Sequence, residues 1–136
     1  MPNTSSSTVD PKLIVRSGRV GLWIVQVALA GMFLLSGGAK LAGVSEMVAM
    51  FDVIGVGQWF RYVTGFIEVV SAVALLVPSL APFGAVVLAA TMVGAIIVHV
   101  FIIGGSPAGP IVLLLGSLAV AWARRDSLFA PLARLR

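Results

Sequence analysis

The sequence contains no cysteine among its 136 residues and a single histidine, His99. The absence of cysteine excludes disulfide bonds, thiol redox chemistry, iron–sulfur ligation and thiolate metal sites. One histidine also excludes a haem held by two histidines of the same chain, although not a haem shared between subunits. Because histidines and carboxylates are so few, we expect no metal site.

Charged residues are scarce as well, since Lys, Arg, Asp and Glu make up 10% of the chain and hydrophobic residues make up 60%. A soluble domain has roughly a quarter of its residues charged and under half apolar. The excess indicates a single domain whose surroundings are the lipid bilayer. The basic residues stand at the ends of apolar runs and form no patch with interleaved aromatics, which argues against nucleic acid as a partner.

Sequence motifs of catalysis are also missing. The chain has no Walker loop, no GxSxG, no HExxH and no Rossmann glycine pattern. We therefore expect no enzyme activity from this chain on its own.

Four apolar runs dominate what remains, and they span residues 20–43, 61–80, 82–103 and 109–123. Each approaches the ~20 residues that a helix needs to cross the hydrocarbon core. Because backbone groups cannot be left unpaired in lipid, helices are the expected structure. The sequence therefore predicts an all-α integral membrane four-helix bundle over residues 20–125, between a disordered tail at 1–19 and a basic tail at 126–136.

The segment between the first two runs predicts a short amphipathic helix between the first and second spans. Ser45 can start it, and Gly55 with Gly57 can end it. Apolar residues repeat at helical spacing within it, namely Met47, Val48, Phe51 and Ile54. Such a helix either lies at the membrane interface or folds over the mouth of the bundle.

The distribution of Lys and Arg predicts the orientation, because basic residues accumulate on the cytoplasmic side. With four spans, both ends of the chain share one side of the membrane. The end segments hold most of the basic residues, namely Lys12, Arg16, Arg19, Arg124, Arg125, Arg134 and Arg136, whereas the opposite loops hold Lys40 and Arg61. The sequence thus predicts a multi-pass protein of the cell (inner) membrane with both termini in the cytoplasm.

Three ionisable residues from different runs reach a similar depth. Lys40 lies in the outermost turn of the first run, Glu68 lies ~10 Å inward from Arg61, and His99 lies ~6 Å from the outer end of the third run. Intramembrane ionisable residues commonly mark functional sites. The candidate ligand pocket toward the outer face therefore comprises Lys40, Glu68 and His99, with Ser36 and Ser71 on the same helix faces.

Each polar residue also has a structural interpretation. Glu68 either pairs with Lys40 to fix helix register, stays protonated as a hydrogen-bond donor, or forms an open ligand or proton site. Lys40 could instead extend to the outer headgroups. We expect Arg61 to anchor in headgroups or to pair with Asp52, and Gln26 to make a helix–helix hydrogen bond.

Four short motifs resemble the DoxX-like family of small four-helix membrane proteins. They are FLLSGGAKLAG at the end of the first run, the Arg61–Glu68 stretch RYVTGFIE, LLVP at 75–78 and MVGAIIVH at 92–99. The glycine in RYVTGFIE stands one residue later than in the family pattern R-x-x-G-x-x-E. The resemblance covers roughly residues 20–125, and Lys40, Glu68 and His99 match polar positions typical of such chains.

The resemblance implies similarity to the membrane subunit of an archaeal thiosulfate:quinone oxidoreductase and to members of oxidative-stress complexes. The first hypothesis is therefore an accessory or anchor subunit that recruits a redox partner protein and offers quinone the pocket. The alternatives are a small proton-coupled transporter working as a homo-oligomer, and a purely structural bundle whose polar cluster specifies packing.

Overall fold

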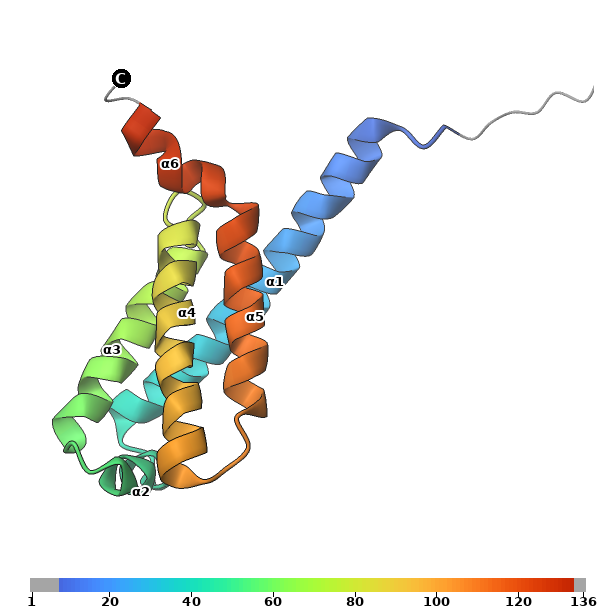
Figure 1. Ribbon diagram of the computed structural model, residues 1–136. Coiled ribbons are helices and arrows are strands. Elements are labelled where there is room, and N and C mark those ends of the chain that lie inside the picture. The colour runs from blue at the N-terminus through green and yellow to red at the C-terminus, as the bar shows by residue number, and fades with distance from the viewer. Residues whose placement is uncertain (1–7, 134–136) are drawn as a thin grey trace, which may run out of the picture.

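The computed structural model describes residues 8–133, and every regular element in that range is helical (Figure 1). The all-α prediction is therefore confirmed for the described part of the chain. The elements are α1 (Pro11–Ala42), α2 (Ser45–Ile54), α3 (Gln58–Leu75), α4 (Ala81–Val98), the π-helical turn η1 (His99–Ile103), α5 (Ala108–Ala123) and α6 (Arg125–Ala133).

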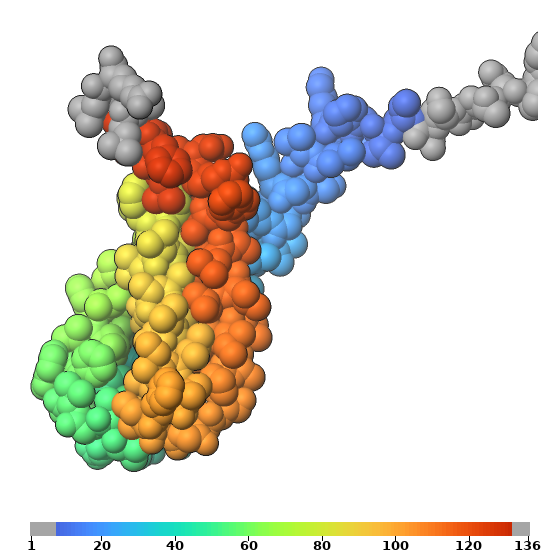
Figure 2. Space-filling model, viewed as in Figure 1, coloured from blue at the N-terminus to red at the C-terminus, as the bar shows by residue number. Residues whose placement is uncertain are grey.

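The four long helices run alternately in opposite directions along the bundle (Figure 1). Helix α1 packs mainly on α3, α3 also packs on α4, and α4 packs on α5. The short helix α2 lies across the end of the bundle where α1 ends and α3 begins, and α6 lies at the opposite end (Figure 1, Figure 2). Consecutive antiparallel neighbours joined by short loops are typical of helical bundles.

The core of the bundle is small and apolar, and its outer faces are apolar too. The buried cluster consists of Leu29, Ala30, Phe33, Ala72, Leu75, Ala85, Leu88, Met92 and Val120. Large aliphatic and aromatic side chains such as Leu35, Phe66 and Phe101 are exposed on the outside. Exposed apolar surface on this scale is a liability in water and suits a lipid environment.

Length and composition mark two helices as able to cross a membrane, α1 and α4 continued through η1. Helices α5 and α6 meet the same criterion only together, as a pair bent by 54°. Helix α3 does not meet it, because Gln58, Arg61 and Glu68 lower its mean hydropathy. These polar side chains face α1 and α2 rather than the outside. That all four long helices cross the membrane stays a prediction.

Helix α1 begins at Pro11, so the predicted disordered tail at 1–19 needs correction for residues 11–19, which are helical. The physical reason is local: the Asp10 side chain accepts a hydrogen bond of 3.0 Å from the Lys12 backbone N–H, and proline is favourable at the first helical position. Residues 1–7 lie outside the described range. The predicted basic tail at 126–136 falls on α6 up to residue 133.

The helix predicted between the first two spans is present as α2 and ends at Gly55, whose φ is 79°. Its residue Phe51 is buried, whereas Asp52 is exposed. Helix α2 contacts α3 and η1, so it folds over the end of the bundle.

Close contact between α1 and α3 depends on glycines at their crossing. A Cβ on Gly37 would lie 2.9 Å from the carbonyl oxygen of Gly65 and 2.9 Å from a methyl carbon of Val69. A Cβ on Gly65 would lie 2.9 Å from the Cβ of Lys40. Small residues at such positions let two helix backbones approach closely in membranes.

We predict that Gly37→Ala destabilises the protein by about 1–3 kcal/mol, because the added methyl group overpacks the crossing. Gly38→Ala is the matched control, since a Cβ on Gly38 meets nothing within 4 Å. Thermal unfolding in detergent measures both. Equal melting temperatures for the two variants would contradict the close crossing.

Candidate functional site

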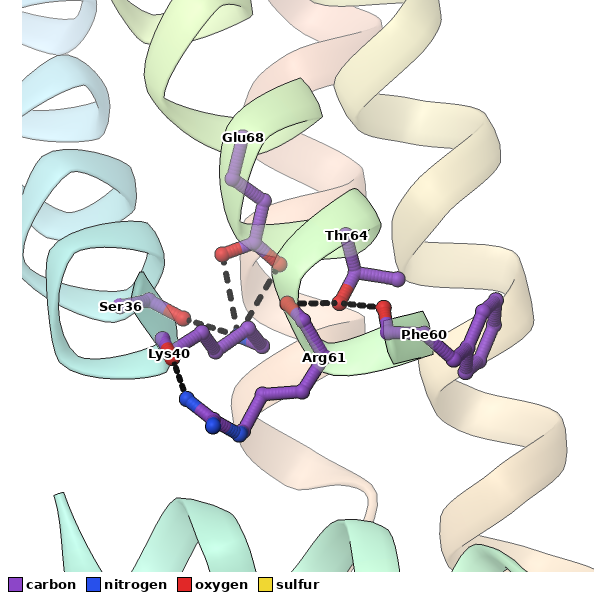
Figure 3. Close-up of polar contacts among 6 residues, drawn as sticks. All are labelled: Ser36, Lys40, Phe60, Arg61, Thr64 and Glu68. Carbon is purple, nitrogen blue, oxygen red and sulfur yellow. Dashed lines mark hydrogen bonds and ion pairs between the residues drawn. The ribbon is translucent and has the colours of Figure 1, made fainter. Parts of the chain in front are cut away.

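An ion pair joins α1 to α3 inside the bundle (Figure 3). The Lys40 Nζ lies 3.1 Å from Oε1 and 3.0 Å from Oε2 of Glu68, and 2.7 Å from the Ser36 hydroxyl oxygen. The Lys40 side chain is 10% exposed and the Glu68 side chain 2%. An ammonium has three N–H donors, so all three have acceptors here. Both side-chain oxygens of the buried Glu68 therefore have a hydrogen-bond partner.

Arg61 adds a second cation next to the pair, at the C-terminal end of α1. Its Nη1 donates to the backbone carbonyl of Lys40 (Figure 3). Helix α1 ends there, with Gly43 in the left-handed conformation at φ 72°. The free carbonyls at a helix C-terminus carry partial negative charge and attract cations. Arg61 therefore stabilises the end of the helix that carries Lys40.

The structure corrects the predicted surroundings of Arg61. This residue is buried, so it does not anchor in the headgroups, and it reaches Asp52 only through Gln58. The Gln58 amide oxygen accepts a 2.6 Å hydrogen bond from Arg61 Nε, and its Nε2 donates to Asp52 Oδ1 at 2.7 Å. Because Gln58 also donates to the carbonyl of Val48, it ties α2 to α3. No pattern in the sequence indicated this role of Gln58.

A cavity of about 490 Å³ opens beside the ion pair, under α2. Residues of α1 to α5 line it, and most of its wall is apolar. Its polar wall residues are Ser36, Lys40, Thr64, Glu68, Thr91 and His99. Pockets for small ligands have volumes of about 300–1,000 Å³ and mainly apolar walls with a few polar groups.

His99 enters this cavity wall at the start of the π-helical turn. Its Nδ1 lies 2.8 Å from the carbonyl oxygen of Ala95, and since a carbonyl only accepts, Nδ1 carries the proton. The turn closes with a 2.9 Å hydrogen bond from the Gly104 N–H to the His99 carbonyl. Single π-turns occur frequently at functional sites. The sequence predicts an ordinary α-helix over residues 99–103, because no residue in this stretch indicates a π-helical turn.

Four of the five candidate residues thus line one cavity: Ser36, Lys40, Glu68 and His99. Ser71 does not, because it lies one turn further along α3 in the contact with α4, where its carbonyl oxygen would be 2.7 Å from a Cβ on Gly84. Three residues of α2 also line the cavity, although the sequence was not expected to place them there. They are Met47, Met50 and Phe51. Their helical spacing was the signal that could have found them.

A second polar cluster lies at the other end of the bundle and involves Gln26, Arg124 and Trp23. Gln26 Nε2 donates to the Leu75 carbonyl at the end of α3 over 2.7 Å, which is the helix–helix hydrogen bond expected of Gln26. Its Oε1 accepts a 2.9 Å hydrogen bond from Arg124 Nε, and the Arg124 guanidinium lies 5.3 Å from the Trp23 ring centroid. Such a satisfied cluster connects α1, α3 and α5.

No group of three or more His, Cys, Asp or Glu side chains within residues 8–133 comes together as a metal site would need.

The apolar helices and the buried polar groups between them define an all-α membrane protein. Within that class, the model of the DoxX-like family matches residues 24–124, so the chain belongs to the DoxX-like family. No curated protein and no solved structure matches the chain.

We predict that Lys40→Met destabilises the protein by about 3–5 kcal/mol, because it leaves the buried carboxylate of Glu68 without its partner. The double variant Lys40→Met/Glu68→Met should recover most of the loss, since neither charge remains. Lys12→Met, on the exposed start of α1, is the control. Thermal unfolding in detergent measures all three, and a double variant no more stable than Lys40→Met would contradict the pairing.

Proposed function

We propose that this DoxX-like protein is an accessory or anchor subunit of a quinone-linked redox complex in the membrane, and that its cavity holds the quinone-type ligand. The observation that supports this most is the cavity itself, because apolar side chains of α2, α3, α4 and α5 line it together with a few polar groups of α1, α3, α4 and η1. A lipid-soluble ring with two oxygen substituents needs that combination of walls.

The apolar part of the cavity suits a flat ring that arrives from lipid. Methionines from α2 and α4 line it, namely Met47, Met50 and Met92, together with Phe51 and Phe60. Methionine is flexible and polarizable, adapts to ligands of irregular shape and makes favourable contacts with aromatic rings. The imidazole of His99 in the same wall can exchange a proton with an oxygen of the ring.

The electrons would come from a partner protein. The chain has no cysteine and one histidine, which leaves it few residues to hold a redox centre of its own. A small membrane subunit that binds the lipid-soluble carrier, next to a partner that supplies electrons, fits this composition. The proposed role is therefore that of a subunit rather than of an independent enzyme.

The proposed orientation places both termini in the cytoplasm and the cavity toward the outer face. The described ends of the chain lie at the same end of the bundle, away from α2 (Figure 1). Helix α1, at 32 residues, is about 48 Å long, against ~30 Å of hydrocarbon. Its excess turns carry Lys12, Arg16 and Arg19, as the cytoplasmic end of a span would.

Proton-coupled transport by an oligomer is the second candidate, and the buried Lys40–Glu68 pair is the observation that favours it. A carrier of this kind would have to break that pair during each cycle. Ion flux into proteoliposomes that disappears in Glu68→Gln would support transport over ligand storage.

We predict that the protein, purified in mild detergent, retains a quinone-type molecule, and that Leu113→Trp lowers the retained amount at least tenfold by filling the cavity. Leu113 lines the cavity, whereas its neighbour Val112 is 65% exposed on the outer surface. Val112→Trp is therefore the matched control and should keep the ligand. Quinone extraction followed by mass spectrometry measures both, and equal amounts in the two variants would place the ligand outside the cavity.

We also predict that a cysteine introduced at Ser106 reacts with a membrane-impermeant maleimide added outside intact cells, whereas one introduced at Asp126 does not. Both positions are exposed, and the natural chain has no cysteine to add background. Lysed cells are the control in which both react. Labelling of Asp126→Cys in intact cells would reverse the proposed orientation.

A further inference from the structure

We infer that the cavity selects the reduced, hydroxyl-bearing form of its ligand, the quinol, over the quinone. This inference rests on the proposed function and adds the redox state of the ligand to it: the cavity would hold the quinol that forms when the partner has supplied two electrons and two protons have been taken up. It follows from a count of hydrogen-bond donors and acceptors on the polar side chains of the cavity wall.

The donors in the wall are almost all occupied. The ammonium of Lys40 donates to Ser36 and to both oxygens of Glu68. The single hydroxyl hydrogen of Thr64 is shared between two backbone carbonyls of its own helix, because Oγ1 lies 3.0 Å from Phe60 O and 3.1 Å from Arg61 O (Figure 3). Local bonds of this kind leave these groups no hydrogen to offer a ligand.

Two further donors of the wall are occupied in the same way. The Thr91 hydroxyl donates to the Val87 carbonyl at 2.9 Å. The Nδ1–H of His99 donates to the Ala95 carbonyl at 2.8 Å. Among the described side chains of this wall, only the hydroxyl hydrogen of Ser36 has no acceptor.

Acceptors, in contrast, remain available. When Nδ1 of the neutral His99 imidazole carries the proton, Nε2 keeps a lone pair. This lone pair has no hydrogen-bond partner among the described residues. The hydroxyl oxygens of Thr64 and Thr91 each keep lone pairs after donating their hydrogens. The polar side chains of the wall therefore offer a bound molecule several acceptors against one free hydroxyl hydrogen, that of Ser36.

The two redox forms of the ligand differ in this property. A quinone has two carbonyl oxygens, which only accept hydrogen bonds, whereas a quinol has two hydroxyl groups, which donate. Against these side chains, only one carbonyl of a quinone would find a donor, the Ser36 hydroxyl, and the other carbonyl would lose its hydrogen bond to water without replacement. A site that pairs with a ligand hydroxyl discriminates strongly against analogues that lack it.

The test compares three ligands with the same ring and side chain: a short-chain quinol, its quinone, and the dimethyl ether of the quinol. Binding to the purified protein is measured anaerobically by isothermal titration calorimetry. We expect the quinol to bind at least tenfold tighter than the quinone and the dimethyl ether, because only the quinol donates hydrogen bonds.

The outcomes distinguish failure of the proposed function from failure of the quinol selectivity. If none of the three ligands binds, the proposed function itself is overturned. If the quinone or the dimethyl ether binds as tightly as the quinol, the proposed function stands and the selectivity is overturned. Diacylglycerol is included because a lipid alcohol offers the same hydroxyl chemistry, and tighter binding of diacylglycerol than of quinol would also overturn the inference.

Variants then locate the selectivity. His99→Phe removes the Nε2 acceptor, and we expect it to weaken quinol binding about tenfold. Thr91→Val removes a hydroxyl acceptor at nearly constant volume and serves as a second variant if His99→Phe fails to fold. Tyr62→Phe removes an exposed hydroxyl group outside the cavity and is the control. Full quinol preference in a folded His99→Phe or Thr91→Val variant would overturn the assignment.

Discussion

The ion pair between Lys40 and Glu68 is the interaction on which the rest of the structure depends. A charged side chain in hydrocarbon is costly unless a partner meets it, so α1 and α3 must pack in the one register that joins these two groups. Gly37 and Gly65 let the helix backbones approach closely enough for the pair to form. The register in turn determines which side chains of α1 and α3 face α4 and α5.

The end of the bundle nearest the pair is closed by a chain of hydrogen bonds. Arg61 donates to the end of α1 and to Gln58, and Gln58 donates to α2. These contacts hold α2 across the bundle, where Phe51 becomes a wall of the cavity. One set of polar residues therefore satisfies the ends of the helices and shapes the space between them.

The two polar clusters of the bundle differ in a way that bears on function. Around Gln26 both ends of the amide are paired, with the Leu75 carbonyl and with Arg124, so the cluster has nothing left to offer a ligand. In the cavity wall, His99 and the threonines keep free acceptors. A ligand that donates hydrogen bonds would pair with these free acceptors.

The sequence by itself determined the class of the protein and its apolar helices, and it predicted that Lys40, Glu68 and His99 share one level of the bundle, where they line one cavity. Hydropathy and helical rise are local quantities that follow directly from residue order. Only the tertiary structure decided that Ser71 lies outside the cavity and that Gln58 stands between Arg61 and Asp52. Such choices depend on how helices rotate and cross, and that depends on contacts between residues far apart in the chain.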